Sequence, residues 1–382
     1  MINYTSFIEI SRKALKNNIH FINSQMNEGV TLSAVVKADA YGHGISCFVP
    51  IAEEAGVRHF SVFSADEAMK VLGVARSNPT IMIMGMIENS ELNWAIQNDI
   101  EFFVFEETRV KEALKAAKEL GKPAKVHLEV ETGLNRTGFT KKELSNIIDD
   151  LKHPLIEVKG FCTHLGGAES IANHYRIQKQ KKKYSQLYKW LVVKGVTPEK
   201  RHMACSAALI RYPETQFDMV RVGILQYGFW PNTETFIHYS AKNKTPDSPL
   251  ERVISWKTKV MSVKKVKTGE FISYGTSFLA DRDMVIAAVP VGYSHGYARS
   301  LSNTGRMLIH GVRTAVVGLV NMNMMLIDVT DIPNVKKGDE VVLIGTQGEH
   351  EVSVASFGEM SNQLNYELLT RLPYEIPRRV VD

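Results

Sequence analysis

The chain has 382 residues, of which 44% are apolar and 23% charged, proportions ordinary for a globular protein large enough for two domains. Its formal net charge of +5 is modest for this length. The one dense basic run, KQKKKYSQLYK at residues 179–189, has helical periodicity, and we interpret it as the solvated face of a helix. The charge pattern therefore argues against nucleic-acid and membrane-surface binding.

The number of cysteines and the length of the apolar runs indicate in which cellular compartment the protein works. The three cysteines, Cys47, Cys162 and Cys205, form no CxxC pair, and no HExxH motif or paired Cys/His ligand spacing occurs. Such a sparse, odd set fits reduced thiols in the cytoplasm. Residues 1–20 contain no signal-peptide core, and the longest apolar runs are too short to span a bilayer. We therefore expect a cytoplasmic protein without a metal or a membrane segment.

Residues 30–225 alternate short β-branched or aromatic runs with charged, helix-like segments, which is the pattern of parallel βα units. Eight such repeats, and the lack of a GxGxxG turn after the first, favour a closed (β/α)8 TIM-type barrel over an open doubly wound sheet. The predicted strands are Val30–Ala38, His59–Ser64, Thr80–Gly85, Glu101–Glu106, Ala124–Glu131, Ile156–Leu165, Arg201–Ser206 and Met219–Leu225.

Beyond the barrel, short strand-like runs separated by Gly, Asp and Pro turns predict a mostly-β C-terminal domain. We place the boundary near residues 235–245, in the polar, proline-bearing stretch PNTETFIHYSAKNKTPDSP. The barrel would then occupy residues 11–240 and the β domain residues 241–382. The segment 1–10 reads as a strand that joins the β domain.

In a barrel of this kind, side chains at the carboxyl ends of the strands meet on one rim, where the active site forms. Titratable and hydrogen-bonding side chains occupy these positions in the sequence. They are Lys37 at the end of the first strand, Glu129 near the end of the fifth with Arg136 just beyond, His164 at the end of the sixth, Ser206 at the end of the seventh and Arg221 within the eighth. Their convergence predicts a catalytic site.

Lys37 is the most informative of these residues, because it closes an apolar run in AVVKADAYGHG. An amine in a partly apolar site has a lowered pKa and can form a Schiff base with a carbonyl compound. A lone lysine at a strand end more often extends to water. Here, however, Tyr41, Ser206 and the backbone at Gly223 and Ile224 could supply donors for a phosphate beside the amine.

The segment AVVKADAYGHG resembles the cofactor-binding segment of the alanine racemase family, which are fold type III pyridoxal-phosphate enzymes. Further matches follow in the family's order and at about its spacing, so the resemblance covers nearly the whole chain. They are HLEVETGLNRTGF, CTHLGGAES, MVRVGILQYG, FISYGTSFLA, VPVGYSHGYAR and LNYELLTRLP.

The resemblance implies that Lys37 binds pyridoxal phosphate covalently and acts as one of two catalytic bases. The second base would be Tyr274, supplied by the β domain of the other subunit of a homodimer with shared active sites. A phenol acts as a base near neutral pH only with help from charge or hydrogen bonds, which the family provides through a histidine, here His164, between Tyr274 and Arg221. Each alone has a plainer interpretation: a core histidine, a turn tyrosine, and an arginine paired with a surface carboxylate.

Arg221 would donate a hydrogen bond to the pyridine nitrogen of the cofactor. Because arginine stays protonated, it transfers no proton, and the ring remains a weaker electron sink than one paired with Asp or Glu. A carbanion at the substrate's Cα is then short-lived, which favours prompt reprotonation and suits racemisation over transamination.

The remaining roles also come from the resemblance. The phosphate would be bound by Tyr41, Ser206, Gly223, Ile224 and Tyr366. The substrate carboxylate would be bound by Arg136 and by the backbone of the other subunit's Met322, and Tyr293 would narrow the entrance. Without the resemblance, Met322 would be assigned to the core.

Two positions depart from the family. Where the family usually has a lysine, often carbamylated, this chain has Glu129, and we hypothesise that its carboxylate replaces the carbamate and pairs with Arg136 directly or through water. In VNMNMM, where the family commonly reads Cys-Met-Asp-Gln, Asn321 and Asn323 replace the cysteine and the aspartate, which removes a negative charge near the substrate.

We therefore expect a pyridoxal-phosphate-dependent amino-acid racemase that interconverts L- and D-alanine with Lys37 and Tyr274, and the family suggests that its product supplies peptidoglycan synthesis. Because of Glu129 and Asn323, three alternatives stay open. They are a broad-specificity racemase or one specific for serine or a basic amino acid, a fold type III decarboxylase, and a pyridoxal-phosphate-binding protein without turnover.

Overall fold

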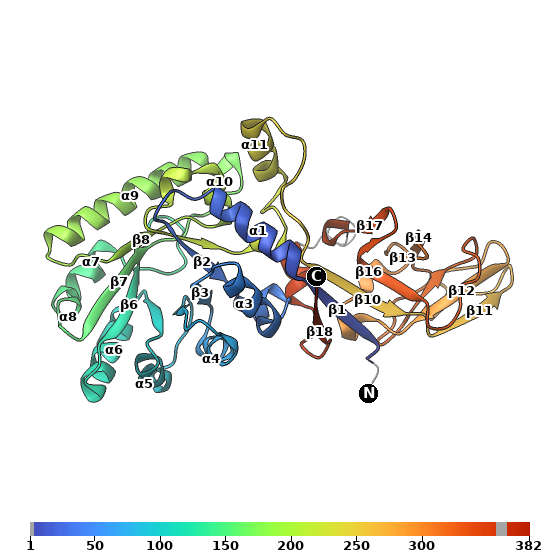
Figure 1. Cartoon of the computed structure of the whole chain (residues 1–382), viewed down its shortest axis with the longest axis horizontal. Helices are drawn as coiled ribbons and strands as arrows, with labels where there is room; N and C mark the ends of the chain where they lie inside the picture. Colours follow the sequence, from blue (N-terminus) through green and yellow to red (C-terminus); the bar gives the residue numbers. More distant parts are fainter. Residues whose placement is uncertain (1–3, 357–364) are drawn as a thin grey trace. The chain divides into compact units, whose positions relative to one another are not determined.

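The computed structural model describes residues 4–356 and 365–382, which fall into two compact units (Figure 1). We call them the barrel unit and the β unit, and each is described by itself. The barrel unit comprises Lys13–Ala40 and Phe48–Glu251, and the β unit comprises Met1–Arg12, Tyr41–Cys47 and Arg252–Asp382.

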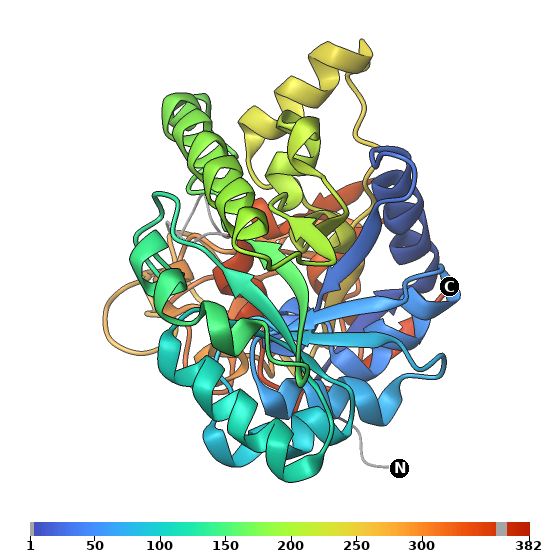
Figure 2. The same cartoon turned by 90° about the vertical axis from the view of Figure 1, so that its left-hand side faces the viewer.

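Eight parallel strands form a closed barrel in the barrel unit, and Figure 2 shows helices around them. Closure is made by β9, which pairs with β2 so that Leu32 lies opposite Val220. The predicted (β/α)8 barrel is therefore confirmed. In barrel order the strands are β2 (Thr31–Val35), β3 (His59–Val62), β4 (Thr80–Ile83), β5 (Glu101–Val104), β6 (Ala124–Glu129), β7 (Ile156–Cys162), β8 (Lys200–His202) and β9 (Met219–Val222).

The helices that accompany the strands are amphipathic. In α6, Val110, Ala113, Leu114 and Ala117 are buried at helical spacing, and the helix ends where Gly121 adopts the left-handed conformation. The helices are α1 (Arg12–Ser24), α3 (Ile45–Glu54), α4 (Ala65–Val74), α5 (Asn89–Gln97), α6 (Glu107–Leu120), α7 (Lys141–Asn146), α8 (Ile148–Leu151), α9 (His174–Val193), α10 (Ser206–Arg211) and α11 (Thr233–Asn243).

The basic run at 179–189 lies on α9, as expected for a solvated helix face. Ile177, Gln180, Tyr184 and Leu187 are buried along one side of this helix, while most of its lysines are exposed. Within the described ranges, no helix combines the length and the apolar character that crossing a membrane requires.

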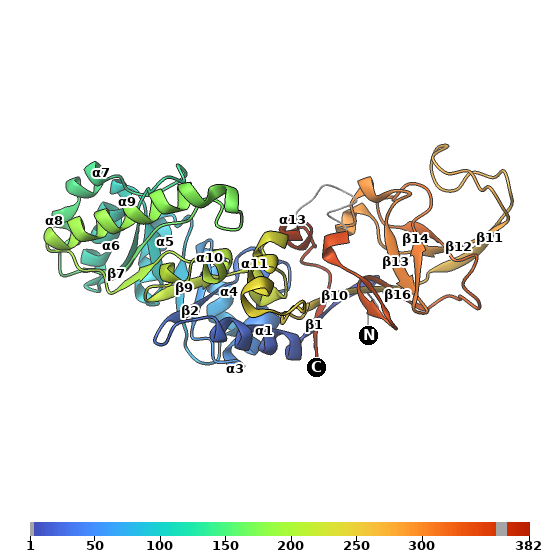
Figure 3. The ribbon, with the colours of Figure 1, turned by 90° about the horizontal axis from the view of Figure 1, so that it is seen from above.

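The β unit contains two sheets, and Figure 3 shows them from above. The larger has the order β14-β13-β16-β10-β1-β18, with β17 on β16, and the smaller has the order β11-β12-β15. Their strands are β1 (Ser6–Ser11), β10 (Ile254–Lys259), β11 (Ser262–Val266), β12 (Met284–Val289), β13 (Arg306–Ile309), β14 (Val312–Ala315), β15 (Met325–Asp328), β16 (Glu340–Gln347), β17 (His350–Val352) and β18 (Arg378–Val381).

The N-terminal strand β1 joins the larger sheet, antiparallel to β10 and parallel to β18. Its alternate residues are buried, as expected for a strand with one face on a core. The C-terminal part of the chain is thus strand-rich, as the sequence predicts, and also carries the short helix α13 (Asn365–Thr370).

Several details differ from the prediction. The polar stretch at the predicted domain boundary contains α11, which begins where the side chain of Asn232 accepts a hydrogen bond from the backbone N–H of Thr235 (2.9 Å). The barrel strands are shorter than predicted, because the apolar runs continue past the last ladder hydrogen bonds into the rim loops. The predicted division at residue 240 stays a prediction.

Candidate active site

Lys37 does not end its strand as predicted, because β2 stops at Val35. Lys37 begins the short segment α2 (Lys37–Tyr41), in which residues 38–41 all have φ between 51° and 54°. Left-handed backbone costs a residue with a side chain roughly 1–2 kcal/mol, so a run of four such residues needs support from its surroundings.

The side chain of Glu67 provides part of this support. Its Oε1 accepts the backbone N–H of Ala38 (2.5 Å), and its Oε2 accepts that of Phe63 (2.8 Å), so the carboxylate ties the turn after β2 to the end of β3. Burial and the nearby Arg136 lower the pKa of Lys37, and Glu67 opposes this shift. Lys37 is therefore an amine that loses its proton more readily than a free lysine, as a nucleophile or base requires.

Arg221 lies in β9 and is only 6% exposed. Its Nη2 donates to the backbone oxygen of Thr163 (2.9 Å), and its Nη1 donates to Nδ1 of His202 and to the backbone oxygen of the same histidine (3.2 Å). Among the described residues, no carboxylate lies within ion-pair distance of this guanidinium. The alternative of an arginine paired with a surface carboxylate is therefore wrong.

His164 follows β7 by two residues, as predicted for the rim. Burial lowers its pKa to about 3, with further lowering by the positive charges of Arg221, Arg136 and Lys37. The imidazole is therefore neutral and presents one donor and one acceptor. Arg221, Arg136 and Lys37 therefore lie near enough to His164 for their charges to act on it.

Ser206 and Gly223 are also brought together at this rim. Ser206 begins α10, and its Oγ accepts the backbone N–H of Gly223 (3.0 Å), just after β9. Both residues and the following Ile224 are buried. A hydroxyl and two consecutive backbone amides in one place provide the donor types that bind phosphate.

Glu129 and Arg136 form a long ion pair. Glu129 ends β6, is buried, and lies 3.9 Å from Nη2 of Arg136, a distance too great for a hydrogen bond. Its Oε2 instead accepts the hydroxyl of Thr137 (2.7 Å). The side chain of Arg136 is 60% exposed, so its guanidinium is accessible to an anion.

In the β unit, the loops that carry the other predicted residues meet. Ser273, next to Tyr274, donates to the backbone oxygen of Leu319 (3.0 Å), and the N–H of Tyr293 donates to the backbone oxygen of Asn321 (3.0 Å). Tyr274 is 71% and Met322 56% exposed. The alternative that Met322 is a core residue is therefore wrong.

Asn323 and Tyr366 take part in local contacts of the β unit. The side-chain amide of Asn323 donates to the hydroxyl of Ser294 (2.9 Å). The rings of Tyr41 and Tyr366 lie 5.9 Å apart between centroids, so these two predicted phosphate residues are neighbours.

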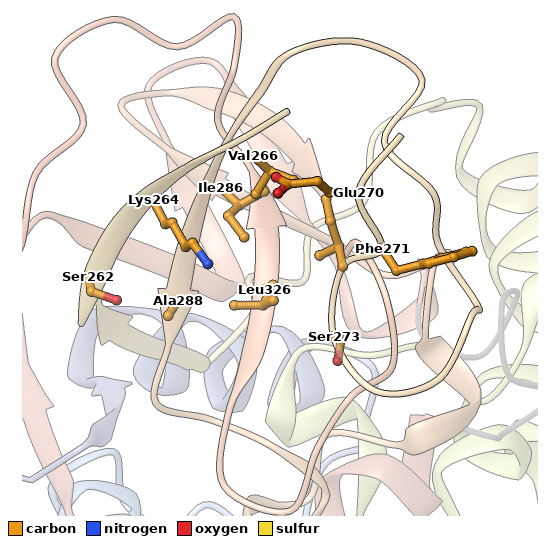
Figure 4. A pocket seen from close by; sticks show the side chains of 10 residues that line it. Ser262, Lys264, Val266, Glu270, Phe271, Ser273, Ile286, Ala288 and Leu326 are labelled. Carbon is orange, nitrogen blue, oxygen red and sulfur yellow. The ribbon is translucent and has the colours of Figure 1, made fainter. Parts of the chain in front are cut away.

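A hollow of about 280 Å³ lies on the β unit beside the Tyr274 loop (Figure 4). Its lining combines the apolar side chains of Ile286 and Leu326 with the charged side chains of Lys264 and Glu270, and it reaches Ser273. Among the described parts of the chain, no group of three or more His, Cys, Asp or Glu side chains is placed to hold a metal ion.

Sequence reasoning missed the residues that hold the rim in place: Glu67, Thr137 and His202. Glu67 stands in Ser64-Ala-Asp-Glu, which reads as an ordinary helix capping box. His202 could have been found from the sequence, because a histidine is unusual in a short strand of a barrel whose strands are otherwise mostly apolar.

A closed barrel with a lysine of lowered pKa, a neutral histidine and a buried arginine on one rim is typical of a barrel enzyme whose amine can react with a carbonyl group. Two family models match the chain: alanine racemase, N-terminal domain, over residues 10–231, and alanine racemase, C-terminal domain, over residues 253–380.

Curated relatives and solved structures agree with these matches. An alanine racemase of Leptospira interrogans is 33% identical over 379 residues, which are 99% of this chain and 96% of the relative. The alanine racemase of Bacillus anthracis with bound L-Ala-P has a TM-score of 0.90 at 31% identity, over 100% of this chain and 96% of that one. The alanine racemase of Bartonella henselae with covalently bound pyridoxal phosphate shares the fold, with a TM-score of 0.84 at 24% identity over 99% and 100% of the two chains.

The chain therefore belongs to the alanine racemase family, as the sequence resemblance predicts. Members of this family are pyridoxal-phosphate-dependent isomerases, and alanine racemisation is the activity that the comparisons support. The alternatives of another substrate or a decarboxylase are not favoured.

We predict that Glu67→Gln weakens the turn that carries Lys37. A glutamine offers one acceptor oxygen instead of two, so one backbone N–H loses its partner, at a cost of about 1–3 kcal/mol. Removing the negative charge also lowers the pKa of Lys37 further, because Glu67 favours the ammonium form. Thermal unfolding measures the first effect, and the pH dependence of the reaction of pyridoxal phosphate with the cofactor-free protein measures the second.

The control for this prediction is Glu143→Gln. Glu143 accepts the backbone N–H of Thr140 (2.7 Å) at the start of α7 and does not contribute to the pKa of Lys37. If the two variants lose the same stability and leave the pKa of Lys37 unchanged, Glu67 has no special role at the turn.

Proposed function

We propose that the protein interconverts L- and D-alanine by a two-base mechanism in which Lys37 and Tyr274 act on opposite faces of the substrate. The observation that carries this proposal is the grouping of Lys37, whose pKa is lowered, with neutral His164 and buried Arg221 on one barrel rim. The barrel, assigned to residues 11–240, would bind the cofactor, and the domain at 241–382 would supply Tyr274.

The donor set of the rim fits pyridoxal phosphate. Lys37 offers an amine for its carbonyl, and Arg221 offers a hydrogen-bond donor for its ring nitrogen. For the phosphate, the proposed partners are Tyr41, Ser206, Gly223, Ile224 and Tyr366. When bound, pyridoxal phosphate withdraws electrons from the substrate's Cα and acidifies the proton there.

The rim residues decide what happens to that proton. With its pKa lowered, Lys37 can accept a proton at its Nζ and return it. Arg221 donates a hydrogen bond without losing its own proton, so it supports less charge withdrawal than an acid in its place would. Prompt return of the proton to Cα is then favoured over transamination.

His164 would act on Tyr274 as a neutral group. Because its pKa is about 3, the imidazole carries no charge near neutral pH and can orient the phenol only by hydrogen bonding. The positive charge that favours loss of the phenol proton would come from Arg221.

The substrate carboxylate would be bound by the exposed guanidinium of Arg136 and the backbone at Met322, with Tyr293 narrowing the entrance. The long contact between Arg136 and Glu129 supports the proposal that a permanent carboxylate takes the place of the carbamate. With Asn323, the substrate region carries one negative charge fewer than is common in the family.

We also propose a homodimer that works in the cytoplasm and supplies D-alanine for peptidoglycan. Tyr274 and Met322 are large, exposed side chains on adjoining loops, which is typical of a surface that meets another subunit. Within the described residues, no disulfide joins Cys47, Cys162 and Cys205, in keeping with a reducing compartment.

Racemisation is tested with single enantiomers of alanine, serine and lysine in deuterium oxide, following optical rotation and deuterium at Cα. We expect both alanine enantiomers to converge on a racemate with deuterium at Cα, and serine and lysine to react far more slowly. Release of carbon dioxide would instead identify a decarboxylase, and cofactor binding without either change would identify a protein without turnover.

Tyr274→Phe should slow proton removal from L-alanine more than from D-alanine, by roughly 10²- to 10⁴-fold, the usual contribution of a general base. If the sites are shared, mixing this variant with inactive Lys37→Ala should restore about a quarter of wild-type activity, because half of the dimers are mixed and each has one intact site. No recovery after subunit exchange would place both bases in one chain.

Because Glu129 carries a permanent carboxylate, we predict that the racemase activity is independent of bicarbonate. The wild-type enzyme should keep its activity in bicarbonate-depleted buffer, because its carboxylate needs no carbon dioxide. The Glu129→Lys variant provides the matched control and should need bicarbonate, since only a carbamylated lysine restores the charge. Loss of wild-type activity on depletion, restored by bicarbonate, would place a carbamate elsewhere and refute the proposal.

A further inference from the structure

A row of polar side chains crosses the interior of the barrel behind Arg221. It runs from Arg221 on β9 to His202 on β8, His127 on β6 and Glu101 on β5. Both imidazoles are completely buried, and Glu101 is 8% exposed. The interiors of such barrels are usually filled with branched apolar side chains, so a polar row at this place needs an explanation.

The contacts in this row are continuous. His202 accepts a hydrogen bond from Arg221 at Nδ1, and its Nε2 lies 2.8 Å from Nδ1 of His127. On the other side, Nε2 of His127 lies 2.7 Å from Oε2 of Glu101. The two rings are nearly perpendicular, at 78°, with centroids 5.0 Å apart.

The partners at the two ends assign every proton in between. A guanidinium has only donors, so Nδ1 of His202 must be an acceptor, and the neutral ring then carries its proton on Nε2. That proton points at Nδ1 of His127, which leaves the proton of His127 on Nε2, facing the carboxylate. All hydrogen bonds therefore run in one direction, from Arg221 to Glu101.

The pKa directions agree with this assignment. Burial, and then the charge of Arg221, lower the pKa of His202, and burial lowers that of His127 despite Glu101. Burial raises the pKa of Glu101, but His127 and His59 together outweigh it and hold the pKa below its ordinary value. The row is thus a cation and a carboxylate connected by two neutral imidazoles.

Within the described parts of the chain, neither end charge is in direct contact with a permanent charge of opposite sign. Arg221 donates hydrogen bonds to neutral groups, and the carboxylate of Glu101 lies 2.7 Å from Nε2 of His127 and 3.6 Å from Nε2 of His59. Among the described residues, neither charge is therefore paired directly with a permanent charge of opposite sign, and a buried charge without compensation is costly.

The barrel also leaves space for the two imidazoles. The strand between β6 and β8 is β7, and its Gly160 lies beside both rings. A Cβ at this position would overlap Nδ1 of His127 and lie 2.6 Å from Nε2 of His202. Any other residue would separate the rings.

We propose that Glu101 is a positioning residue for Arg221: by holding the proton of His127 on Nε2, it keeps Nδ1 of that ring available to accept from His202, and the intact row orients the guanidinium. Without the carboxylate, the Nε2 proton of His127 has no acceptor. If His127 moves its proton to Nδ1, that N–H faces the N–H of His202, and the row breaks beside Arg221. The consequence for the cofactor rests on the proposed function, but the tautomers do not.

The test is the ¹⁵N NMR spectrum of the histidine rings in the holoenzyme, with His127 and His202 assigned by His→Gln variants. In wild type, we expect both rings to remain neutral with the proton on Nε2 throughout the pH range in which free histidine titrates. In Glu101→Leu, the ring of His127 should show mixed tautomers, whereas Arg221 still requires Nδ1 of His202 as an acceptor. Glu101→Gln retains an acceptor oxygen and should keep the wild-type tautomers.

The matched control is Glu53→Gln. Glu53 is a buried carboxylate of the barrel unit that accepts hydrogen bonds from Ser77 and the N–H of Arg76, outside the row. The Glu53→Gln variant should leave the ¹⁵N signals of the histidine rings, the pH dependence of the cofactor absorbance and kcat unchanged. Glu101→Leu should alter that absorbance and lower kcat on the order of a hundredfold, because misplacing a group at the reacting centre has effects of this size.

An imidazolium or a proton on Nδ1 at either ring in wild type overturns the proposal, and so do unchanged tautomers in Glu101→Leu. If that variant does not fold, the wild-type and Glu101→Gln spectra still decide the question. If the tautomers are as expected but the protein racemises no amino acid, the proposed role of Glu101 is supported and the proposed function is refuted.

Discussion

Arg221 brings a permanent positive charge into a barrel rim where its hydrogen-bond acceptors are all neutral. The electrostatics of the rim follow from this placement. Burial, and then this charge, lower the pKa of both His164 and His202. The charge also requires a negative charge within reach, which the barrel supplies at Glu101 on the far side of two imidazoles.

The turn after β2 imposes a second constraint, which is conformational. Four consecutive residues in the left-handed region place Lys37 at the rim, at a cost that ordinary local structure would not impose. A carboxylate that accepts two backbone N–H groups stabilises by a comparable amount per bond, because hydrogen bonds to charged groups contribute about 1.5–3 kcal/mol each. Glu67 therefore supports the position of Lys37 and moderates its charge at once.

The sequence was informative wherever a residue's role depends on strand order. Hydrophobic runs located all eight barrel strands, and the barrel rule then placed Lys37, His164 and Arg221 on one rim. The left-handed turn was not predictable, because Val36 and Ala38 continue the apolar run. Glu101 and His127 were missed for a related reason: each lies within a predicted strand, and sequence does not show which strands across a closed barrel bring their side chains together.

Glu129 shows how such constraints limit what a substitution can do. Its carboxylate is buried and accepts the hydroxyl of Thr137, so its position is fixed by β6 and not by Arg136. A longer carbamylated side chain in its place would extend further toward Arg136. The guanidinium of Arg136 is mostly exposed and lies 3.9 Å from the carboxylate of Glu129. Its charge is therefore neutralised in part, but the carboxylate does not hold it in one orientation. The restraint on Arg136 would then come from the substrate carboxylate itself, so that binding would order the group that recognises it.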